Sequence, residues 1–172
     1  MNITDANITE EKLYLFNQGQ YFHSYRIFGA HPVEGGVRFT VWCPDVRSVG
    51  VVGSFNDWTP QYLTPQGSTG VYSGVIPQAK VGDLYKYRIT SAEGETFDKA
   101  DPYAFWAEVR PGTASRIAQL DGYTWHDGRY QAIRRSTKSP RPMNIYEVHL
   151  GSWKQQEQPE DPDYPFLSYR QL

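Results

Sequence analysis

The sequence has little cysteine, little net charge and no long hydrophobic run. Its single cysteine, Cys43, excludes an intramolecular disulfide, and the neighbouring apolar residues predict a buried, inert thiol. The four histidines, His23, His31, His126 and His149, lack the spacing of metal ligands. We therefore expect no metal site, no cofactor and a reducing compartment.

The weak charge excludes further classes of partner. A net charge of -2 argues against nucleic-acid or membrane-surface binding, which needs a basic excess on one face. The only basic cluster, residues 134 to 141, lies among Ser and Pro residues typical of a solvated linker. No stretch approaches the roughly 20 apolar residues of a membrane span, and residues 1 to 5 do not begin a signal peptide. We expect a cytoplasmic monomer that binds neither nucleic acid nor membrane.

Aromatic residues are abundant, at 15% of the chain. From Tyr25 to Ile117 they stand in short alternating runs, separated by Gly, Pro, Asn and Asp at intervals of about ten residues. This pattern is typical of a β-sandwich, and the length suits one well-buried domain. We predict strands over residues 37–42, 48–54, 70–76 and 83–89, and a tight turn over 92–95.

The two ends of the chain follow other patterns. Residues 8–18 predict a short helix capped by Thr9. Residues 145–150 predict one strand, which lacks a sheet of its own and should therefore be loosely packed in isolation. The expected organisation is a leader with a helix at 1–24, a sandwich at 25–120, a linker at 121–142 and a separate segment at 143–172.

Several motifs point to a known family. They are Phe39 to Pro44, Val51 to Trp58 with its Gly-Ser-Phe-Asn-Asp-Trp run, residues 86–88, 99–104, 111–115 and 146–153, and finally 169–172. In this order, over nearly the whole length, they resemble the glycogen- and starch-binding module that precedes the catalytic barrel of bacterial 1,4-α-glucan branching enzymes. The resemblance implies an all-β fold, an immunoglobulin-like β-sandwich, with a short N-terminal helix and, at 143–172, the start of an α-amylase-type (β/α)8 barrel.

The same resemblance implies a function. The parent enzyme would cut an α-1,4-linked glucan and transfer the segment to a 6-hydroxyl to form an α-1,6 branch. Retaining transfer needs two carboxyl groups about 5 Å apart, which the family takes from later barrel strands. Asp98 and Asp101 are no substitute, because Asp101 precedes a proline in an expected turn and nothing nearby should raise its pKa. We therefore expect this chain alone to be inactive, with an α-glucan and the missing catalytic barrel as its partners.

By the same resemblance, Trp58 would stack on a sugar ring, Lys86 would contact a hydroxyl, and Phe97 would replace a second tryptophan platform imperfectly. Each residue also has a structural interpretation: Trp58 could cap the sandwich, and Lys86 could be a solvated surface lysine. Trp42, Phe55 and Tyr87 are expected in the core. Asn56 and Asp57 are expected to form their turn through side-chain hydrogen bonds.

Other functions remain open at this point. The chain could be a stand-alone glycogen-binding module with a targeting or regulatory role, and the sequence after Leu172 would test this. It could be a structural sandwich without sugar affinity, in which case Trp58→Ala would affect only stability. The same module also occurs in debranching and trehalose-forming enzymes.

Overall fold

The computed structural model describes all residues except 1–3, 5–6, 137–141, 161 and 163–164. It divides into two compact units, Met1–Thr124 and Trp125–Leu172. The boundary falls within the segment 121–142 that the sequence analysis interpreted as a linker.

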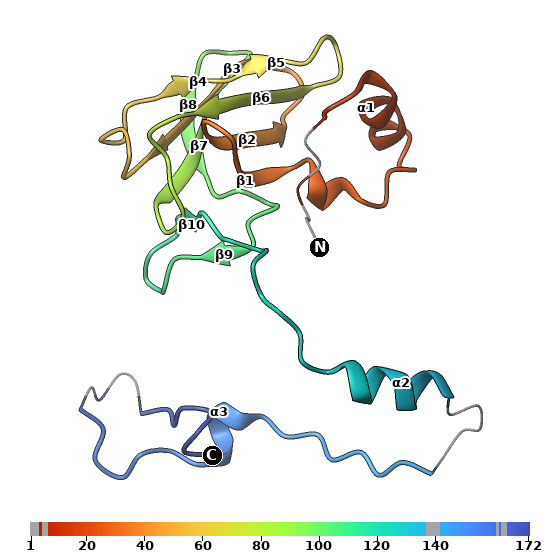
Figure 1. Cartoon of the computed structure of the whole chain (residues 1–172). Coiled ribbons are helices and arrows are strands. Elements are labelled where there is room, and N and C mark those ends of the chain that lie inside the picture. Colours follow the sequence, from red (N-terminus) through yellow and green to blue (C-terminus); the bar gives the residue numbers. More distant parts are fainter. Residues whose placement is uncertain (1–3, 5–6, 137–141, 161, 163–164) are drawn as a thin grey trace. The chain divides into compact units, whose positions relative to one another are not determined.

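The first unit contains two antiparallel sheets (Figure 1). One has the order β1 (Gly29–Val33), β2 (Gly36–Trp42), β6 (Val71–Ile76) and β5 (Thr64–Pro65). The other has the order β4 (Gln61–Tyr62), β3 (Val46–Gly53), β7 (Leu84–Ser91), β10 (Ser115–Arg116) and β9 (Trp106–Ala107). A further strand, β8 (Thr96–Lys99), pairs with the second half of β7.

The main core lies where the two sheets face each other. Alternate residues of each strand point inward, so Phe39 of β2 and Val51 of β3 meet Tyr85 and Tyr87 of β7 in one buried cluster. The predicted β-rich, sandwich-like fold is confirmed. All four predicted strands occur, as β2, β3, β6 and β7, and the predicted turn at 92–95 joins β7 to β8.

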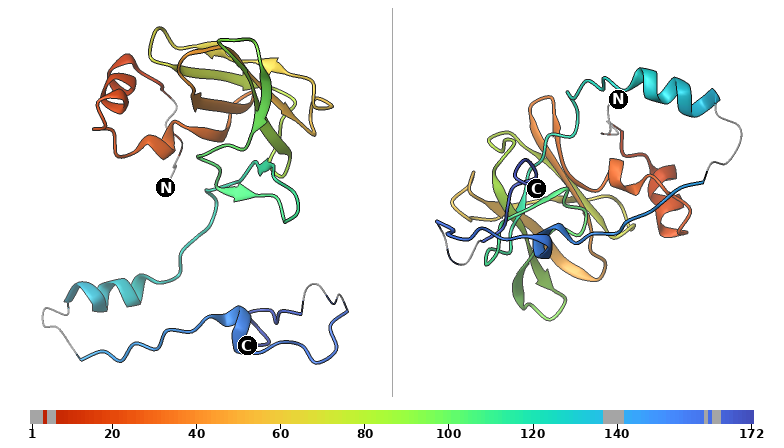
Figure 2. Two further views of the ribbon diagram at one scale, coloured as in Figure 1. Left: turned by 180° about the vertical axis from the view of Figure 1, so that it is seen from behind. Right: turned by 90° about the horizontal axis from the view of Figure 1, so that it is seen from below.

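A second, smaller core joins the N-terminal segment to the first sheet. Helix α1 spans Glu10–Asn17, and the Thr9 hydroxyl caps it by accepting a hydrogen bond from the backbone N–H of Lys12 at 3.3 Å, as predicted. A 3-10 turn at Ser24–Arg26 follows. Leu13 of α1 packs with Ile27, Phe28 and Val71. The helix therefore lies against the end of β6 (Figure 2).

Two predictions about the core are wrong. Trp42 is 49% exposed, because it is the last residue of β2 and points out of the sandwich, with its ring centroid 6.2 Å from that of Phe16. Cys43, one residue later, is only half-buried, although this burial still raises the pKa of its thiol. Phe55 packs partly against the core, whereas Tyr87 is fully buried as predicted.

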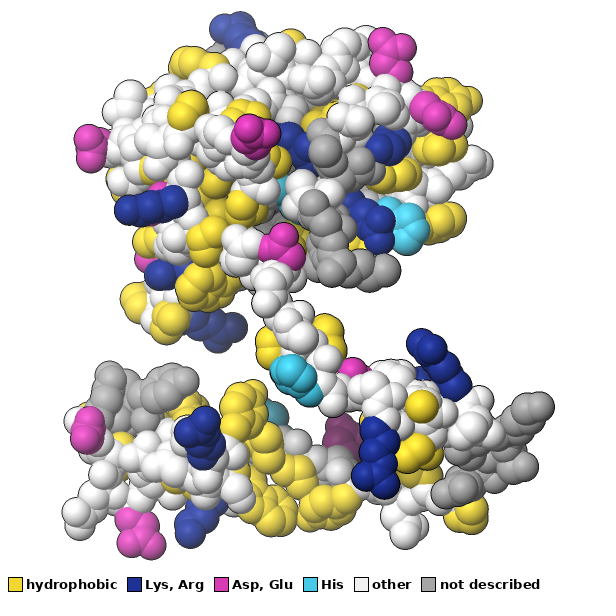
Figure 3. Space-filling view, in the orientation of Figure 1, with side chains coloured by type: hydrophobic (Ala, Val, Ile, Leu, Met, Phe, Trp, Pro, Cys, Tyr) yellow, Lys and Arg dark blue, Asp and Glu magenta, His cyan; other side chains and the backbone are white. Residues whose placement is uncertain are grey.

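The second unit contains α2 (Gly128–Ser136), α3 (Leu150–Trp153) and an isolated bridge between Gln155 and Phe166. The strand predicted at 145–150 does not form, and no described residue pairs with this segment in a sheet. Helix α2 occupies part of the segment 121–142 that the sequence predicted as a linker, and residues 137–141 of that segment lie outside the described residues. Figure 3 shows hydrophobic side chains on the surface of this unit, and Ile145, Tyr146 and Trp153 are among the exposed ones.

Where the structure describes the chain, none of its helices is both long and apolar enough to cross a membrane.

Candidate functional site

The turn that follows β3 is built around Asn56. Its side-chain carbonyl accepts a hydrogen bond from the N–H of Gly53 at 2.8 Å, and its amide donates to Val51 O at 3.0 Å and to Gln61 Oε1 at 3.3 Å. The prediction that Asn56 forms the turn through its own side chain is confirmed. For Asp57 it is wrong: the carboxylate has no hydrogen-bond partner among the described residues, and Asp57 contributes a left-handed backbone with φ 50°.

The same turn presents Trp58 to solvent. Trp58 is 39% exposed and has φ 56°, a conformation that is rare outside glycine. Its N–H donates to Gly53 O at 3.0 Å, and its carbonyl accepts from Arg88 Nη1 at 3.4 Å. Backbone strain of this kind persists only where surrounding contacts enforce it, and it gathers at functional sites.

Lys86 lies on the outward face of β7. Tyr85 and Tyr87 point into the core, so Lys86 and Arg88 share the opposite face, as the alternation predicted. The Lys86 ammonium donates to the Thr113 hydroxyl at 2.7 Å, which fixes its position. Because Arg88 also contacts the backbone of Trp58, the structure brings Trp58 and Lys86 to one surface.

An ion pair completes this face. The Arg88 guanidinium donates to both carboxylate oxygens of Asp98, at 2.8 and 2.9 Å. These hydrogen bonds hold the pKa of Asp98 below its usual range and raise the pKa of Arg88. We call the group formed by Trp58, Lys86, Arg88, Asp98 and Thr113 the Trp58 surface.

Phe97 does not join the Trp58 surface. It pairs with Ile89 across the β7–β8 ladder, and directly paired side chains lie on the same face of a sheet. That face is the inner one, opposite to Lys86 and Arg88. The ring is nevertheless 39% exposed, because β8 is an edge strand, and the Lys99 ammonium lies 5.4 Å from its centroid.

Asp101 has a role that the sequence analysis missed. It is only 6% exposed, and its carboxylate accepts hydrogen bonds from the Tyr85 hydroxyl at 2.6 Å, the Tyr87 hydroxyl at 3.3 Å and the Tyr103 N–H at 2.7 Å. Burial raises the pKa of Asp101, so the expectation that nothing would raise it is wrong. The available signal was the pair of inward tyrosines, since the hydroxyl of a buried tyrosine needs a hydrogen-bond partner.

Asp98 and Asp101 do not form a catalytic pair. Asp98 is held by Arg88 on the outer face of the sheet, whereas Asp101 is buried.

The chemistry of the Trp58 surface suits binding. An exposed indole offers a flat apolar face, while the neighbouring ammonium, guanidinium and hydroxyl groups can hydrogen-bond a polyhydroxylated ligand. Within the described parts of the chain, no three His, Cys, Asp or Glu side chains lie close enough together to hold a metal ion.

A β-sandwich with an exposed indole beside hydrogen-bonding groups resembles a carbohydrate-binding module, and comparison with known families agrees. Residues 27–104 match the family described as "Carbohydrate-binding module 48 (Isoamylase N-terminal domain)". Residues 27–104 are therefore similar to a carbohydrate-binding module of this family.

Similarity to known proteins extends beyond this module. The chain is 45% identical over 97% of its length to the 1,4-alpha-glucan branching enzyme GlgB of Bacillus caldolyticus, and 44% identical over 96% to that of Desulfitobacterium hafniense. It spans about a quarter of the length of these curated relatives, 25% and 26% respectively. The resemblance to branching enzymes is confirmed. Among solved structures, PulA from Klebsiella oxytoca is 27% identical, with a TM-score of 0.47 over 54% of this chain and 10% of that one.

Proposed function

We propose that the first unit binds α-glucan through the Trp58 surface, and that the whole protein is a 1,4-α-glucan branching enzyme. The observation that carries the proposal is 45% identity to a branching enzyme over 97% of this chain, which includes the second unit as well as the module. A stand-alone binding module would have no reason to resemble a branching enzyme in residues 125–172, which lie outside the module.

The binding role rests on the Trp58 surface. Trp58 would stack on the apolar face of a glucose ring, and Lys86, already oriented by Thr113, would donate to a hydroxyl. The bound geometry is largely preformed, because Asn56 fixes the turn and Arg88 holds the Trp58 carbonyl. Preorganisation lowers the entropic cost of binding. Phe97 would add at most a contact reached around the edge of β8.

Glucan transfer would use carboxyl groups outside these 172 residues. Neither Asp98 nor Asp101 is available for this chemistry. Asp98 is paired with Arg88, and Asp101 accepts hydrogen bonds from two tyrosine hydroxyls. We propose that residues 143–172 form the start of a (β/α)8 barrel when the rest of that barrel is present. The exposed Met143, Ile145 and Tyr146 fit this role, since contiguous exposed apolar residues mark surfaces that another element covers.

The proposal extends to the setting of the protein. The sandwich would be of the immunoglobulin type, and the protein would be a cytoplasmic monomer that needs no cofactor. Its partners would be an α-glucan, such as glycogen, and the catalytic barrel.

Affinity electrophoresis through gels with and without glycogen tests the binding role. We expect glycogen to retard the 172-residue chain, and both Trp58→Ala and Lys86→Ala to reduce the retardation, Trp58→Ala more strongly. Trp106→Ala is a matched control, because Trp106 is 46% exposed in the same unit but one face of its ring carries the Arg116 guanidinium at 4.7 Å. Equal retardation of the wild type and a folded Trp58→Ala variant would contradict the proposed surface.

A chimera tests the enzymatic role. In it, this chain replaces the matching quarter of the Bacillus caldolyticus relative, and new α-1,6 branches are counted after incubation with amylose. We expect the chimera to branch amylose and the 172-residue chain alone to leave it unchanged. A folded chimera that hydrolyses α-1,6 bonds, or that forms none, would contradict the assignment to branching enzymes.

A further inference from the structure

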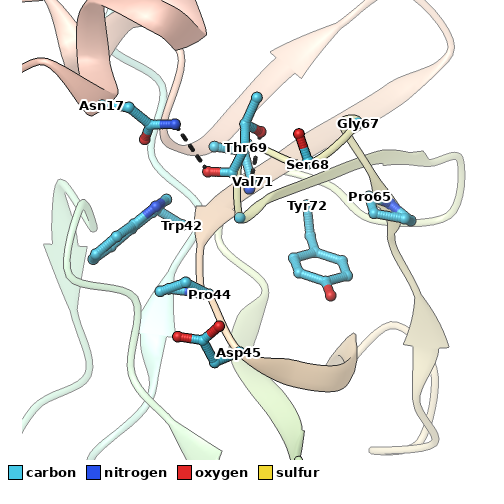
Figure 4. A pocket seen from close by; sticks show the side chains of 11 residues that line it. Asn17, Trp42, Pro44, Asp45, Pro65, Gly67, Ser68, Thr69, Val71 and Tyr72 are labelled. Carbon is cyan, nitrogen blue, oxygen red and sulfur yellow. Dashed lines mark hydrogen bonds between the residues drawn. The ribbon is translucent and has the colours of Figure 1, made fainter.

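A groove of about 440 Å³ opens at the other end of β3 from Trp58 (Figure 4). Trp42 at the end of β2, with Pro44 and Asp45 from the loop that follows it, lines one side, and the β5–β6 hairpin, including Ser68 and Tyr72, lines the other. Its size falls in the range of roughly 300–1,000 Å³ found for small-molecule sites. We call it the Trp42 groove.

The walls of the groove are fixed by hydrogen bonds. The N–H of Cys43 donates to Gly70 O at 2.8 Å, which ties the Trp42 segment to the hairpin. Asn17 at the end of α1 donates to Thr69 O at 3.2 Å, which ties the helix to the same hairpin. Gly70 permits this close approach, because it has φ 76° and an added Cβ would lie 3.1 Å from Trp42 Nε1. The cavity is therefore preformed.

Polar groups in the groove are available to a ligand. The carboxylate of Asp45 and the hydroxyl of Ser68 have no hydrogen-bond partner among the described residues, and both side chains are exposed. Asp45 is also one of three non-glycine residues described with positive φ, at 58°. The other two, Asp57 and Trp58, form the turn of the Trp58 surface. Strain of this kind points to a functional role.

We propose that the Trp42 groove is a second α-glucan site. A glucose ring would stack on the exposed indole of Trp42, while the Asp45 carboxylate and the Ser68 hydroxyl would bind its hydroxyl groups. A neutral, hydroxyl-rich ligand suits this set of groups, because they combine one aromatic face with an acceptor and a donor and include no basic side chain to attract an anion. The choice of ligand rests on the proposed function of the module, whereas the groove and its geometry do not.

The positions of the two sites predict how they cooperate. Asp45 directly precedes β3, and the Trp58 turn is hydrogen-bonded to Gly53 at its other end. The strand between them has eight residues, which corresponds to roughly 25 Å. A maltotriose molecule would occupy one site at a time, but a polysaccharide could engage both. Engaging both at once raises the apparent affinity without any new contact.

The indole N–H signals in ¹H–¹⁵N NMR spectra test the proposal site by site. The chain has five tryptophans, so the Trp42 and Trp58 signals can be assigned from the Trp42→Phe and Trp58→Phe variants. During titration of the 172-residue chain with maltotriose, we expect both signals to shift and the Trp106 signal to stay in place. In Trp58→Ala the Trp42 signal should still shift, with an unchanged midpoint. If only the Trp58 signal moves, the second site is wrong and the proposed binding at the Trp58 surface stands. If only the Trp42 signal moves, the Trp42 groove binds the sugar and the proposed binding at the Trp58 surface is wrong.

Two mild substitutions separate binding from stability. Asp45→Asn keeps a residue that tolerates positive φ and removes the charge, and Ser68→Ala changes an exposed hydroxyl. We expect Asp45→Asn to weaken maltotriose binding at Trp42 about tenfold and Ser68→Ala about threefold, because a charged hydrogen bond is worth more than a neutral one. Neither should change the unfolding temperature or the midpoint of the Trp58 signal. Unchanged Trp42 midpoints in both folded variants would overturn the proposal.

Discussion

At the scale of single residues, polar side chains decide where the aromatic residues point. The Asn56 side chain hydrogen-bonds the backbone N–H of Gly53 and the backbone carbonyl of Val51 at the end of β3. The turn is thereby held in a form in which Trp58 faces solvent. Asp101 does the opposite, since its buried carboxylate holds the hydroxyls of Tyr85 and Tyr87 inside. Burial raises the pKa of both phenols well above the ordinary value, so they remain donors throughout the physiological range.

Asp101 should therefore leave a signature in the pH dependence of stability. Because its pKa is raised in the folded state, folding favours the protonated carboxyl, and this contribution is complete below the unfolded pKa of about 3.9. It is lost as pH rises to the folded pKa, with a slope of at most about 1.4 kcal/mol per pH unit for one proton. We expect the difference in unfolding free energy between the wild type and Asp101→Asn to fall over this range and to level off above it.

Urea denaturation of both proteins across this pH range measures the difference. Other titrating groups, such as His31, whose pKa is lowered mainly by burial, cancel because both chains share them. Asp98 also cancels; its lowered pKa adds stability above its unfolded pKa that is lost as pH falls through the folded value. A difference that stays constant, or that grows with pH, would show that the carboxyl is not buried as described.

At the scale of elements, the sequence predicts most of the strands that carry the core. The alternation of β7 identifies Tyr85 and Tyr87 as inward and Lys86 as outward. A strand with one buried and one exposed face alternates apolar and polar residues along the sequence. Alternation alone does not predict the short strands β4, β5, β9 and β10, which have two residues each and pair only through tertiary contacts. Nor does it show that Trp42 ends its strand and leaves the core.

The same limit applies to the candidate site. The sequence predicts Trp58 and Lys86 as a pair, but the face of Phe97 depends on the register between β7 and β8. That register pairs Phe97 with Ile89 and so places it on the inner side. The Trp42 groove is formed by segments far apart in the chain, which no local pattern brings together.

Two adjacent glycines, Gly35 in the β1–β2 turn and Gly36 at the start of β2, provide a test of this packing. Gly36, with φ 143°, would place a Cβ only 2.4 Å from Ile76 O on β6, whereas a Cβ on Gly35, with φ 86°, meets nothing within 4 Å. We expect Gly35→Ala to cost about 1–2 kcal/mol through backbone strain alone. Gly36→Ala should cost clearly more, because the β6 backbone must also move. Chemical denaturation compares the two variants, and equal losses would contradict the described contact between β2 and β6.

At the scale of the whole molecule, the stability of the chain resides in its first unit. Every buried apolar residue of the two core clusters lies between Leu13 and Ile117. In the described part of residues 125–172, no residue is fully buried. The second unit therefore adds little buried apolar area, and it owes its structure to local contacts such as the Gln155–Phe166 bridge.

A chain that ends at Thr124 should thus fold like the full chain. We expect its thermal unfolding midpoint to stay within about 3 °C, since removing the second unit should cost less than about 1 kcal/mol. Its retardation by glycogen should also be unchanged, because Trp58, Lys86 and Thr113 are all retained. A chain that ends at Gly112 is the matched control: it loses β10, including Ser115, whose hydroxyl accepts from the Asp101 N–H at 2.9 Å, and the fully buried Ile117. This shorter chain should fail to fold. If instead the chain ending at Thr124 unfolds well below the full chain, residues 125–172 must contribute packing to the sandwich, and the conclusion that the stability resides in the first unit would be wrong.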